Sequence, residues 1–287
     1  MALFAELNDL FVRYRIRPKK TLGQHFMINE DVIRKLVELA DLSPSDKVVE
    51  VGAGTGFLTR ELAAKCKVFA YELDYDLCDL LMEELKELNV SIICGDFLKA
   101  QLPDFNKVVS IPPYRISKKI VLKILKHEFD SALLVFQEEF AEKLTAMPGF
   151  PSYSAITVFL QHKADVEVIE KVSASSFFPK PKSDSAIIRI LPHKQSKPSE
   201  SDALFYRFVA ELFRYRKKNL SNALACAEAF LNSNFGINYE TTQKELKDFN
   251  LDSKVELTEV SEFFELFETI SAVSQKKEKK KLARKQT

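Results

Sequence analysis

The sequence lacks paired cysteine motifs and long apolar runs, and it has only seven glycines. Its four cysteines show no C-x-x-C spacing, which argues against a zinc site or a disulfide framework. We therefore expect no metal and reduced, mostly buried thiols at Cys66, Cys78, Cys94 and Cys226. No stretch approaches the roughly 20 apolar residues of a membrane span.

The N-terminus lacks the apolar region of a signal peptide because basic residues interrupt it. These residues are Arg13, Arg15, Arg17, Lys19 and Lys20. We therefore expect a soluble, cytoplasmic protein that does not act at a membrane. With 46% hydrophobic residues among 287, the chain can bury a full core, and its length predicts one large domain and a smaller one.

An excess of one charge is also missing, because the net charge is only +1. This sum argues neither for nor against a nucleic-acid partner, and the distribution of charge matters more. Basic residues gather at 13–20, 115–126, 214–218 and 276–285. Each cluster fits either a surface for phosphates or a solvated helix face.

Short β-rich runs alternate with helical patterns in the first half of the chain, which predicts βαβ units on a mostly parallel sheet. We expect these strands at 48–52, 68–73, 91–95, 107–111 and 132–136. Two further runs, at 166–172 and 186–191, lie close together and are candidates for an antiparallel edge.

The polar stretch 193–202 contains a proline and several serines and is typical of a linker. Beyond it the pattern is helical, as at 204–214 and 259–270. We therefore expect an α/β domain at 1–192 with an N-terminal basic extension, a helical domain at 203–275, and a basic, disordered tail at 276–287. No internal repeat is visible.

Five of the seven glycines fall in the first third, three of them in Glu50-Val-Gly-Ala-Gly-Thr-Gly56. This run follows an apolar stretch and precedes a helical pattern, so it predicts a strand, a glycine turn and a helix. Glycine allows a ligand to contact the main chain, and the helix offers free amides at its start. A nucleotide-like ligand fits this arrangement better than a metal.

The spacing of these glycines weakens an NAD-binding interpretation, because G-x-G-x-x-G would need glycine at Phe57 or Thr59. G-x-G-x-G after an acidic residue instead resembles the first motif of S-adenosylmethionine-dependent methyltransferases. Two later acids end predicted strands: Glu72, suited to the ribose hydroxyls, and Asp96, suited to the adenine amino group. In this order they predict S-adenosylmethionine binding.

Several further motifs carry a more specific resemblance. In order they are Lys19-Lys-Thr-Leu-Gly-Gln-His-Phe26, the glycine run, Glu72, Gly95-Asp96, Pro113-Tyr114-Arg-Ile-Ser117 and Phe177-Phe-Pro-Lys-Pro-Lys-Ser-Asp-Ser185. Over 15–192 the chain closely resembles the small-subunit rRNA adenine N6,N6-dimethyltransferases of the KsgA type. Phe213-Arg-Tyr-Arg-Lys-Lys-Asn-Leu220 resembles the basic helix of that family's C-terminal domain.

The resemblance implies a class I methyltransferase fold, which is Rossmann-like with a seven-stranded, mostly parallel sheet and a small all-α C-terminal domain that binds RNA. It implies methylation of two adjacent adenines at N6 near the 3′ end of small-subunit rRNA, during ribosome biogenesis, by a monomer acting on the immature subunit.

The residue roles that the resemblance implies fall into three groups. Catalytic residues are Tyr114, Pro112 and Phe177. Cofactor-binding residues are Gln24, Phe26, Gly52, Gly54, Glu72, Asp96 and Ser110. RNA-binding residues are Arg115, Lys118, Lys119, Arg214, Arg216, Lys217 and Lys218. His25 is expected to be a structural or cofactor-rim residue.

One position departs from the family pattern. Aligned without a gap on Pro113-Tyr114, the family's Asn is replaced by Ile111, which accepts no hydrogen bond. Ser110 lies one residue early, and its side chain should face the other way on a strand unless the chain shifts locally. Our hypothesis is that cofactor and RNA binding are retained while catalysis is impaired.

Three alternatives to an active small-subunit enzyme follow. The first is an assembly factor that binds the subunit without catalysis, which Ile111 would favour. The second is a large-subunit rRNA or transcription-associated member of the superfamily, which Gly-Gln-His-Phe and the basic C-terminal segment disfavour. The third is a small-molecule methyltransferase, which the basic clusters and helical domain disfavour.

Overall fold

The computed structural model describes residues 2–283, with side chains through residue 276. The chain divides into two units. The sheet unit comprises Met1–Glu142 and Ala164–Lys197, and the helical unit comprises Lys143–Lys163 and Pro198–Thr287. Within the described part of the chain, no helix is both long and apolar enough to span a bilayer.

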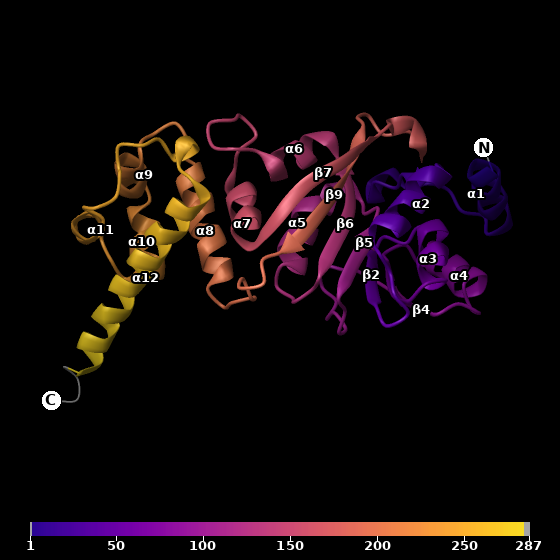
Figure 1. Cartoon of the computed structure of the whole chain (residues 1–287), viewed down its shortest axis with the longest axis horizontal. Helices are drawn as coiled ribbons and strands as arrows, with labels where there is room; N and C mark the ends of the chain where they lie inside the picture. Colours follow the sequence, from indigo (N-terminus) through magenta and orange to yellow (C-terminus); the bar gives the residue numbers. More distant parts are fainter. Residues whose placement is uncertain (1, 284–287) are drawn as a thin grey trace. The chain divides into compact units, whose positions relative to one another are not determined.

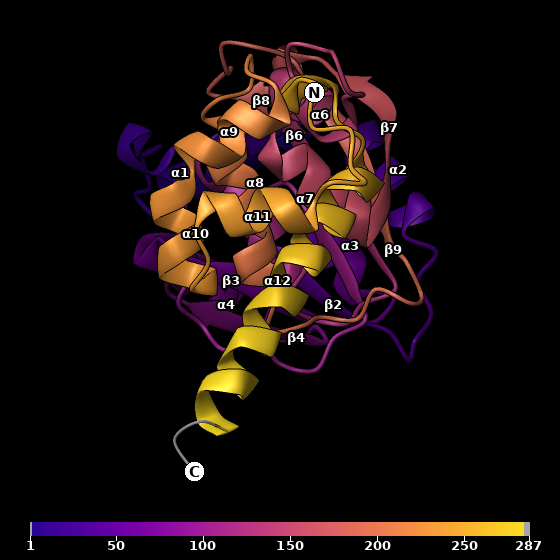
Figure 2. The ribbon, with the colours of Figure 1, turned by 90° about the vertical axis from the view of Figure 1, so that its left-hand side faces the viewer.

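The sheet unit contains a seven-stranded sheet in the order β4-β3-β2-β5-β6-β9-β7. Figure 1 labels these strands except β3, which is labelled in Figure 2. The parallel strands are β2 (Lys47–Val51), β3 (Lys67–Glu72), β4 (Val90–Cys94), β5 (Lys107–Ser110) and β6 (Ser131–Gln137). The last two strands, β9 (Ser185–Pro192) and β7 (Ala164–Val172), form the predicted antiparallel edge. Apolar runs form the central strands because both faces of such a sheet are covered.

Helices α3 (Phe57–Ala63), α4 (Tyr75–Glu84) and α5 (Ser117–Ile124) join parallel strands. Helix α2 (Glu30–Leu39) precedes β2, and α6 (Glu138–Thr145) follows β6. The side chain of Asn29 caps α2 and that of Asp74 caps α4, each by accepting an amide hydrogen bond in the first turn. Because Asp74 lies only two residues after the end of β3, the cap of α4 is at the carboxyl end of the sheet.

The N-terminal segment, expected to be a basic extension, begins with a helix. Residues Ala2–Arg13 form helix α1, which buries Leu3, Leu7 and Leu10. The spacing of these leucines puts them on one helical face, and burial of that face holds the helix against the unit. A short turn follows at Lys20–Leu22, and then the two-residue strand β1 (Phe26–Met27) pairs with β8 (Phe177–Phe178).

The helical unit contains α7 (Ala155–Lys163), α8 (Asp202–Phe213), α9 (Leu220–Cys226), α10 (Glu228–Phe235), α11 (Tyr239–Glu245) and α12 (Val260–Ala283). Figure 2 shows α8 to α12 in orange and yellow. Helix α12 packs against α7, α8, α10 and α11. The all-α C-terminal domain is therefore confirmed, and no helix or strand spans 193–201.

Two predicted boundaries are wrong. Residues 143–163 belong to the helical unit rather than to the α/β domain, because α7 is buried on nearly every side and packs Phe159 against Phe205 and Tyr206 of α8. The tail predicted at 276–287 is helical through Ala283 as the end of α12. Its last residues, 284–287, lie outside the described part.

Candidate active site

A pocket lies in the sheet unit where β2, β3 and β5 end. Open α/β sheets bind ligands at this edge. The pocket brings together predicted residues from both groups, cofactor-binding and catalytic. They are Gln24, Phe26, Gly52, Gly54, Glu72, Pro112, Tyr114 and Phe177.

The glycine turn that follows β2 needs bare backbone at two positions. Gly52 has φ of +76°, and a Cβ there would lie 2.9 Å from Cδ of Pro113. Gly54 has φ of +60°, and a Cβ there would touch the ring of Phe26 at 3.4 Å. Residues with a side chain rarely adopt this backbone conformation. Glycine therefore allows the turn and also lets Pro113 and Phe26 approach the main chain.

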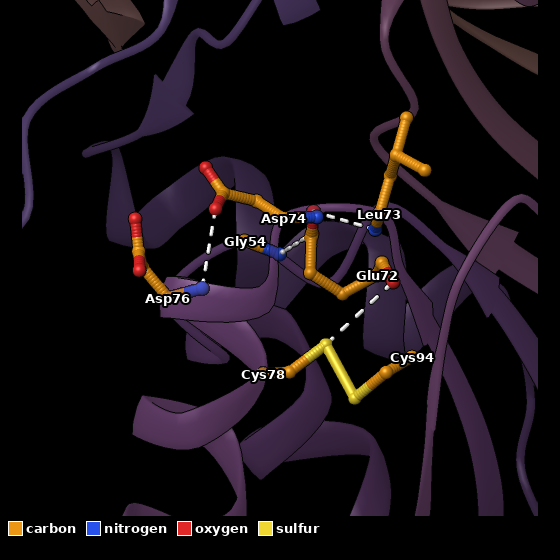
Figure 3. The surroundings of a disulfide bond; sticks show 7 residues. All are labelled: Gly54, Glu72, Leu73, Asp74, Asp76, Cys78 and Cys94. Carbon is orange, nitrogen blue, oxygen red and sulfur yellow. Dashed lines mark hydrogen bonds between the residues drawn. A yellow bond between two sulfur atoms is a disulfide. The ribbon is translucent and has the colours of Figure 1, made fainter.

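Glu72 at the end of β3 lines the pocket and binds the main-chain amides around it. One carboxylate oxygen accepts the amide of Gly54 at 2.9 Å, and the other accepts those of Leu73 and Asp74 at 2.8 and 2.9 Å (Figure 3). Burial raises the pKa of Glu72, and the amide hydrogen bonds oppose that rise. A carboxylate offers about four acceptor positions, so capacity for a ligand hydroxyl remains.

Glu50, the acidic residue of the glycine motif, is buried within β2 and does not line the pocket. Among the described side chains, its Oε2 and the hydroxyl of Thr59 are buried without a hydrogen-bond partner. Burial raises the pKa of Glu50 to about 8, while the nearby Thr59 lowers it slightly. Burial therefore favours the protonated form of Glu50.

The segment that covers the pocket is tied to the start of α4. Oε1 of Gln24 accepts the amide of Lys19 at 2.7 Å, and Nε2 of Gln24 donates to Asp74 at 2.8 Å. The Lys19 amine also bridges Asp74 and Asp76 at 2.6 and 2.7 Å. Burial alone would raise the pKa of Asp74, but Lys19 and Gln24 bring it below its ordinary value. The predictions missed Asp74, although it lies only two residues after Glu72.

The β1–β8 pair joins the two motif segments that are farthest apart in the chain. Phe26 pairs with Phe178 in register, and Phe177 of β8 reaches the pocket. Helix α1 supports this pair, because Phe11 packs edge-on against Phe26 and Phe4 against Phe178, both with ring centroids 5.2 Å apart. Two-residue strands have no periodicity, so the sequence could not predict them.

Tyr114 and its aromatic neighbours form another wall of the pocket. The Tyr114 ring lies edge-on to Phe177 at 6.2 Å and stacks on His25 at 5.9 Å. Its hydroxyl shares a 2.7 Å hydrogen bond with Ser185, and burial raises its pKa to about 12. Nδ1 of His25 donates to the carbonyl of Pro179, which fits a structural residue at the rim.

Ile111 lines the pocket, whereas the preceding residue does not. Ser110 is fully buried, and its hydroxyl donates to the carbonyl of Val51 at 2.7 Å and accepts the amide of Val51 at 3.1 Å. No local shift turns it toward the pocket, so the structure does not bring Ser110 to the cofactor site as predicted. Pro112, whose main-chain carbonyl is the other acceptor expected from the resemblance, lines the pocket.

Asp96 also lies outside the lining of this pocket. Its carboxylate accepts the amide of Leu98 at 2.9 Å and so caps the turn after β4. Its contact with the adenine amino group stays a prediction.

The predicted RNA-binding residues of the sheet unit differ in their contacts. Arg115 donates to the carbonyl of Thr21 at 2.6 Å and packs beside Gly23, so its side chain holds the segment over the pocket. Lys118 and Lys119 lie on the exposed part of α5.

The predicted basic helix at 213–220 is wrong. Helix α8 ends at Phe213 and α9 begins at Leu220, with Asn219 capping α9. Residues 214–218 between them form a loop held around Glu256, which accepts from Arg216 at 3.1 Å and from Lys217 at 3.0 Å. This loop belongs to the helical unit.

The expectation of four reduced thiols is wrong for one pair. Cys78 of α4 and Cys94 at the end of β4 form a disulfide, with Cα atoms 6.0 Å apart and a sequence separation of 16 (Figure 3). No sequence motif predicts this disulfide, because Cys78 and Cys94 come together only through the packing of α4 on β4. Cys66 is buried and unpaired, and Cys226 is unpaired and exposed.

The residues of the pocket fit S-adenosylmethionine. The turn at Gly52 and Gly54 is a cradle that a Cβ would fill, and the Glu72 carboxylate provides a buried acceptor beside it. Across the side chains described, no group of three or more His, Cys, Asp or Glu residues is arranged to hold a metal ion.

Comparisons with known proteins identify the family. The sequence model of the family "Ribosomal RNA adenine dimethylase" matches residues 15–271. The chain is 45% identical over 216 residues to a probable ribosomal RNA small subunit methyltransferase A of Pyrococcus abyssi, covering 75% of this chain and 78% of that protein. A protein of the same description from Thermococcus gammatolerans is 39% identical over 244 residues, covering 85% and 84%.

Solved structures show the same fold. A dimethyladenosine transferase from Plasmodium falciparum superimposes with a TM-score of 0.77 at 25% identity, covering 84% of this chain and 96% of that one. The 23S rRNA methyltransferase ErmE gives a TM-score of 0.61 at 28% identity, covering 85% and 99%. The fold is that of class I methyltransferases, whose cofactor in this family is S-adenosylmethionine. The chain belongs to the ribosomal RNA adenine dimethylase family.

Proposed function

We propose that this chain dimethylates N6 of two adjacent adenines near the 3′ end of small-subunit rRNA. One observation carries the proposal: a single pocket joins a donor half (Gln24, Gly52, Gly54 and Glu72) to an acceptor half (Ile111–Tyr114 and Phe177). The relatives at 39 and 45% identity are named for the small subunit, whereas the 23S rRNA enzyme is 28% identical. The proposal includes a monomer acting on the immature subunit in the cytoplasm.

The donor half holds the cofactor through main chain and carboxylate. Glu72 is placed to accept the ribose hydroxyls, and the glycine turn admits the rest of the ligand. When bound, S-adenosylmethionine supplies an activated methyl group on its sulfonium. Holding the reacting atoms in line within a near-attack geometry can supply much of the acceleration of such a displacement.

The acceptor half takes an adenine that has left its stack. A base reached for methylation is held between flat or apolar side chains, and Tyr114 with Phe177 provides such a surface. The N6 lone pair is delocalised into the purine ring, so acceptors for its N–H groups help to localise it. In this chain the Pro112 carbonyl is the acceptor that we assign to this role.

Because Ile111 accepts no hydrogen bond, we expect it to lower the rate of methyl transfer. A side-chain acceptor missing from the transition state costs on the order of 10² to 10³ in rate, by analogy with a lost oxyanion-hole donor. This apolar lining is also the one observation that favours the second candidate, a subunit assembly factor that binds cofactor and rRNA with slow or no transfer.

The test incubates labelled S-adenosylmethionine with unmethylated small subunits and compares the native chain with Ile111→Asn. We expect measurable dimethyladenosine from the native chain and a faster rate from the variant. Transfer by the variant alone would support the assembly factor. Label on any base other than adenine would overturn the proposed function, and equal rates for both proteins would contradict the role given to position 111.

A further inference from the structure

One face of the helical unit combines exposed apolar side chains with exposed cations. We call this the loop face, and define it by residues 147–151, 214–218 and 254–257. Three of the large hydrophobic side chains that the unit exposes lie on it: Met147, Phe150 and Leu257 are 66, 58 and 51% exposed. Single exposed hydrophobic residues are ordinary, but neighbouring ones indicate an interaction site.

The backbone that carries Phe150 is held firmly. Arg216 donates to the carbonyls of Phe150 and Pro151 at 3.3 and 2.9 Å. The amide of Gly149 donates to the carbonyl of Glu256 at 2.7 Å, and that of Phe150 to Met147 at 3.2 Å. The exposed ring is therefore displayed by a fixed loop.

The next aromatic residue in the loop behaves in the opposite way. Tyr153 is fully buried, and its hydroxyl donates to the carbonyl of Thr258 at 3.0 Å. Its amide donates to the carbonyl of Phe150 at 3.1 Å. The loop is thus anchored by one aromatic side chain while it leaves the other in solvent, which a purely structural loop would not require.

The charge around Phe150 is positive. The three segments contain five basic residues and one acid, Glu256. The Glu256 side chain is only 9% exposed and is paired with Arg216 and Lys217, whereas the Lys217 side chain is 78% exposed. Arg214 and Lys218 are also exposed, and Arg214 is paired with Glu211 of α8. The surface offered to a partner is therefore cationic beside an aromatic ring.

Aromatic side chains set among cations fit unpaired RNA, whose bases stack while its phosphates meet lysine and arginine. A stable protein partner fits less well, because such an interface buries about 800 Å² on each side and carries few charges at its centre. We propose that Phe150 stacks against an unpaired base of the substrate RNA, with Lys217 and Lys218 on the flanking phosphates. This inference rests on the proposed function for the nature of the RNA.

The test measures binding of the full chain to unmethylated small subunits. Phe150→Ala and Phe150→Leu should both weaken binding by about 10-fold, the effect of losing one base–aromatic stack, while Phe150→Tyr stays within about 2-fold. Lys218→Gln should lower the slope of log affinity against log salt by about one unit. Met82→Ala removes a side chain of the sheet unit that is 51% exposed and serves as the matched control.

The outcomes separate this inference from the proposed function. Ultraviolet crosslinking should join small-subunit RNA to the peptide that contains Phe150, in the wild type and in Phe150→Tyr only. Binding by Phe150→Leu that equals wild type would overturn stacking and indicate an apolar protein contact. Phe150→Ala that binds as well as Met82→Ala would also overturn it. If either result is found while the wild-type chain still binds and methylates small subunits, only the stacking inference is wrong and the proposed function is not contradicted.

Discussion

In the donor half of the pocket the polar groups are main-chain amides around a buried carboxylate, whereas the acceptor half presents aromatic and aliphatic side chains. Glu72 binds three amides, and the turn at Gly52 depends on backbone conformation. In the acceptor half the lining residues are aliphatic or aromatic, among them Ile111, Tyr114 and Phe177. The donor half therefore tolerates few substitutions, whereas one substitution in the acceptor half can change the rate and leave the cofactor site intact.

The sharpest test of the donor half is Gly52→Ala. Its Cβ would lie 2.9 Å from Pro113 in a backbone conformation strained for alanine, so we expect cofactor affinity to fall at least about 100-fold. Isothermal titration with S-adenosylmethionine measures the change.

A matched control separates strain from contact. Gly236 has φ of +64°, but a Cβ there would meet nothing within 4 Å. Gly236→Ala should therefore lower stability by about 1 kcal/mol and leave cofactor affinity unchanged. Wild-type affinity in Gly52→Ala would show that the donor half is not built on the main chain.

In the acceptor half, Tyr114→Ala should lower the rate of RNA methylation by about 10- to 100-fold through the lost stacking surface. Cofactor affinity should stay within about 2-fold, because the donor half does not depend on this ring. Tyr114→Phe keeps the ring and removes only the hydrogen bond to Ser185, so its rate should resemble wild type. A Tyr114→Ala enzyme with unchanged rate and base binding would exclude this role.

The smallest expected effect on methyl transfer comes from Glu50, which lies behind the donor half and does not line the pocket, so its test is a measurement of stability. Its pKa of about 8 lies above its value of about 4.5 in the unfolded chain, so the folded state keeps a proton that the unfolded state releases. Its contribution to stability is full below pH 4.5 and is lost as pH rises to about 8, at up to about 1.4 kcal/mol per pH unit. Glu50→Gln should remove that slope in urea unfolding measured across pH. Parallel profiles for both proteins would mean that Glu50 is ionised in the fold.

The sheet could be predicted because its strands are locally encoded. Each of the seven predicted strands lies within two residues of the observed one, since apolar runs bounded by turns mark buried strands. The assignment of α7 failed for a physical reason: a helix that is apolar all round does not indicate which neighbour covers it.

The site was predictable where a residue's role follows from the backbone around it. Gly52, Gly54 and Glu72 come together because parallel strands end at one edge. The roles of Ser110 and Arg216 were missed because both side chains are occupied by tertiary partners, Val51 in one case and Glu256 in the other. No local pattern encodes such partners.

The β1–β8 pair has a consequence for the order in which the protein is made. His25 and Pro179, which meet beside this pair, are separated by 154 positions in the chain. Domains generally fold as units during synthesis. The covering segment can pair with β8 only after residue 178 has left the ribosome. Nascent chains cut short before that point should therefore lack the enclosed pocket.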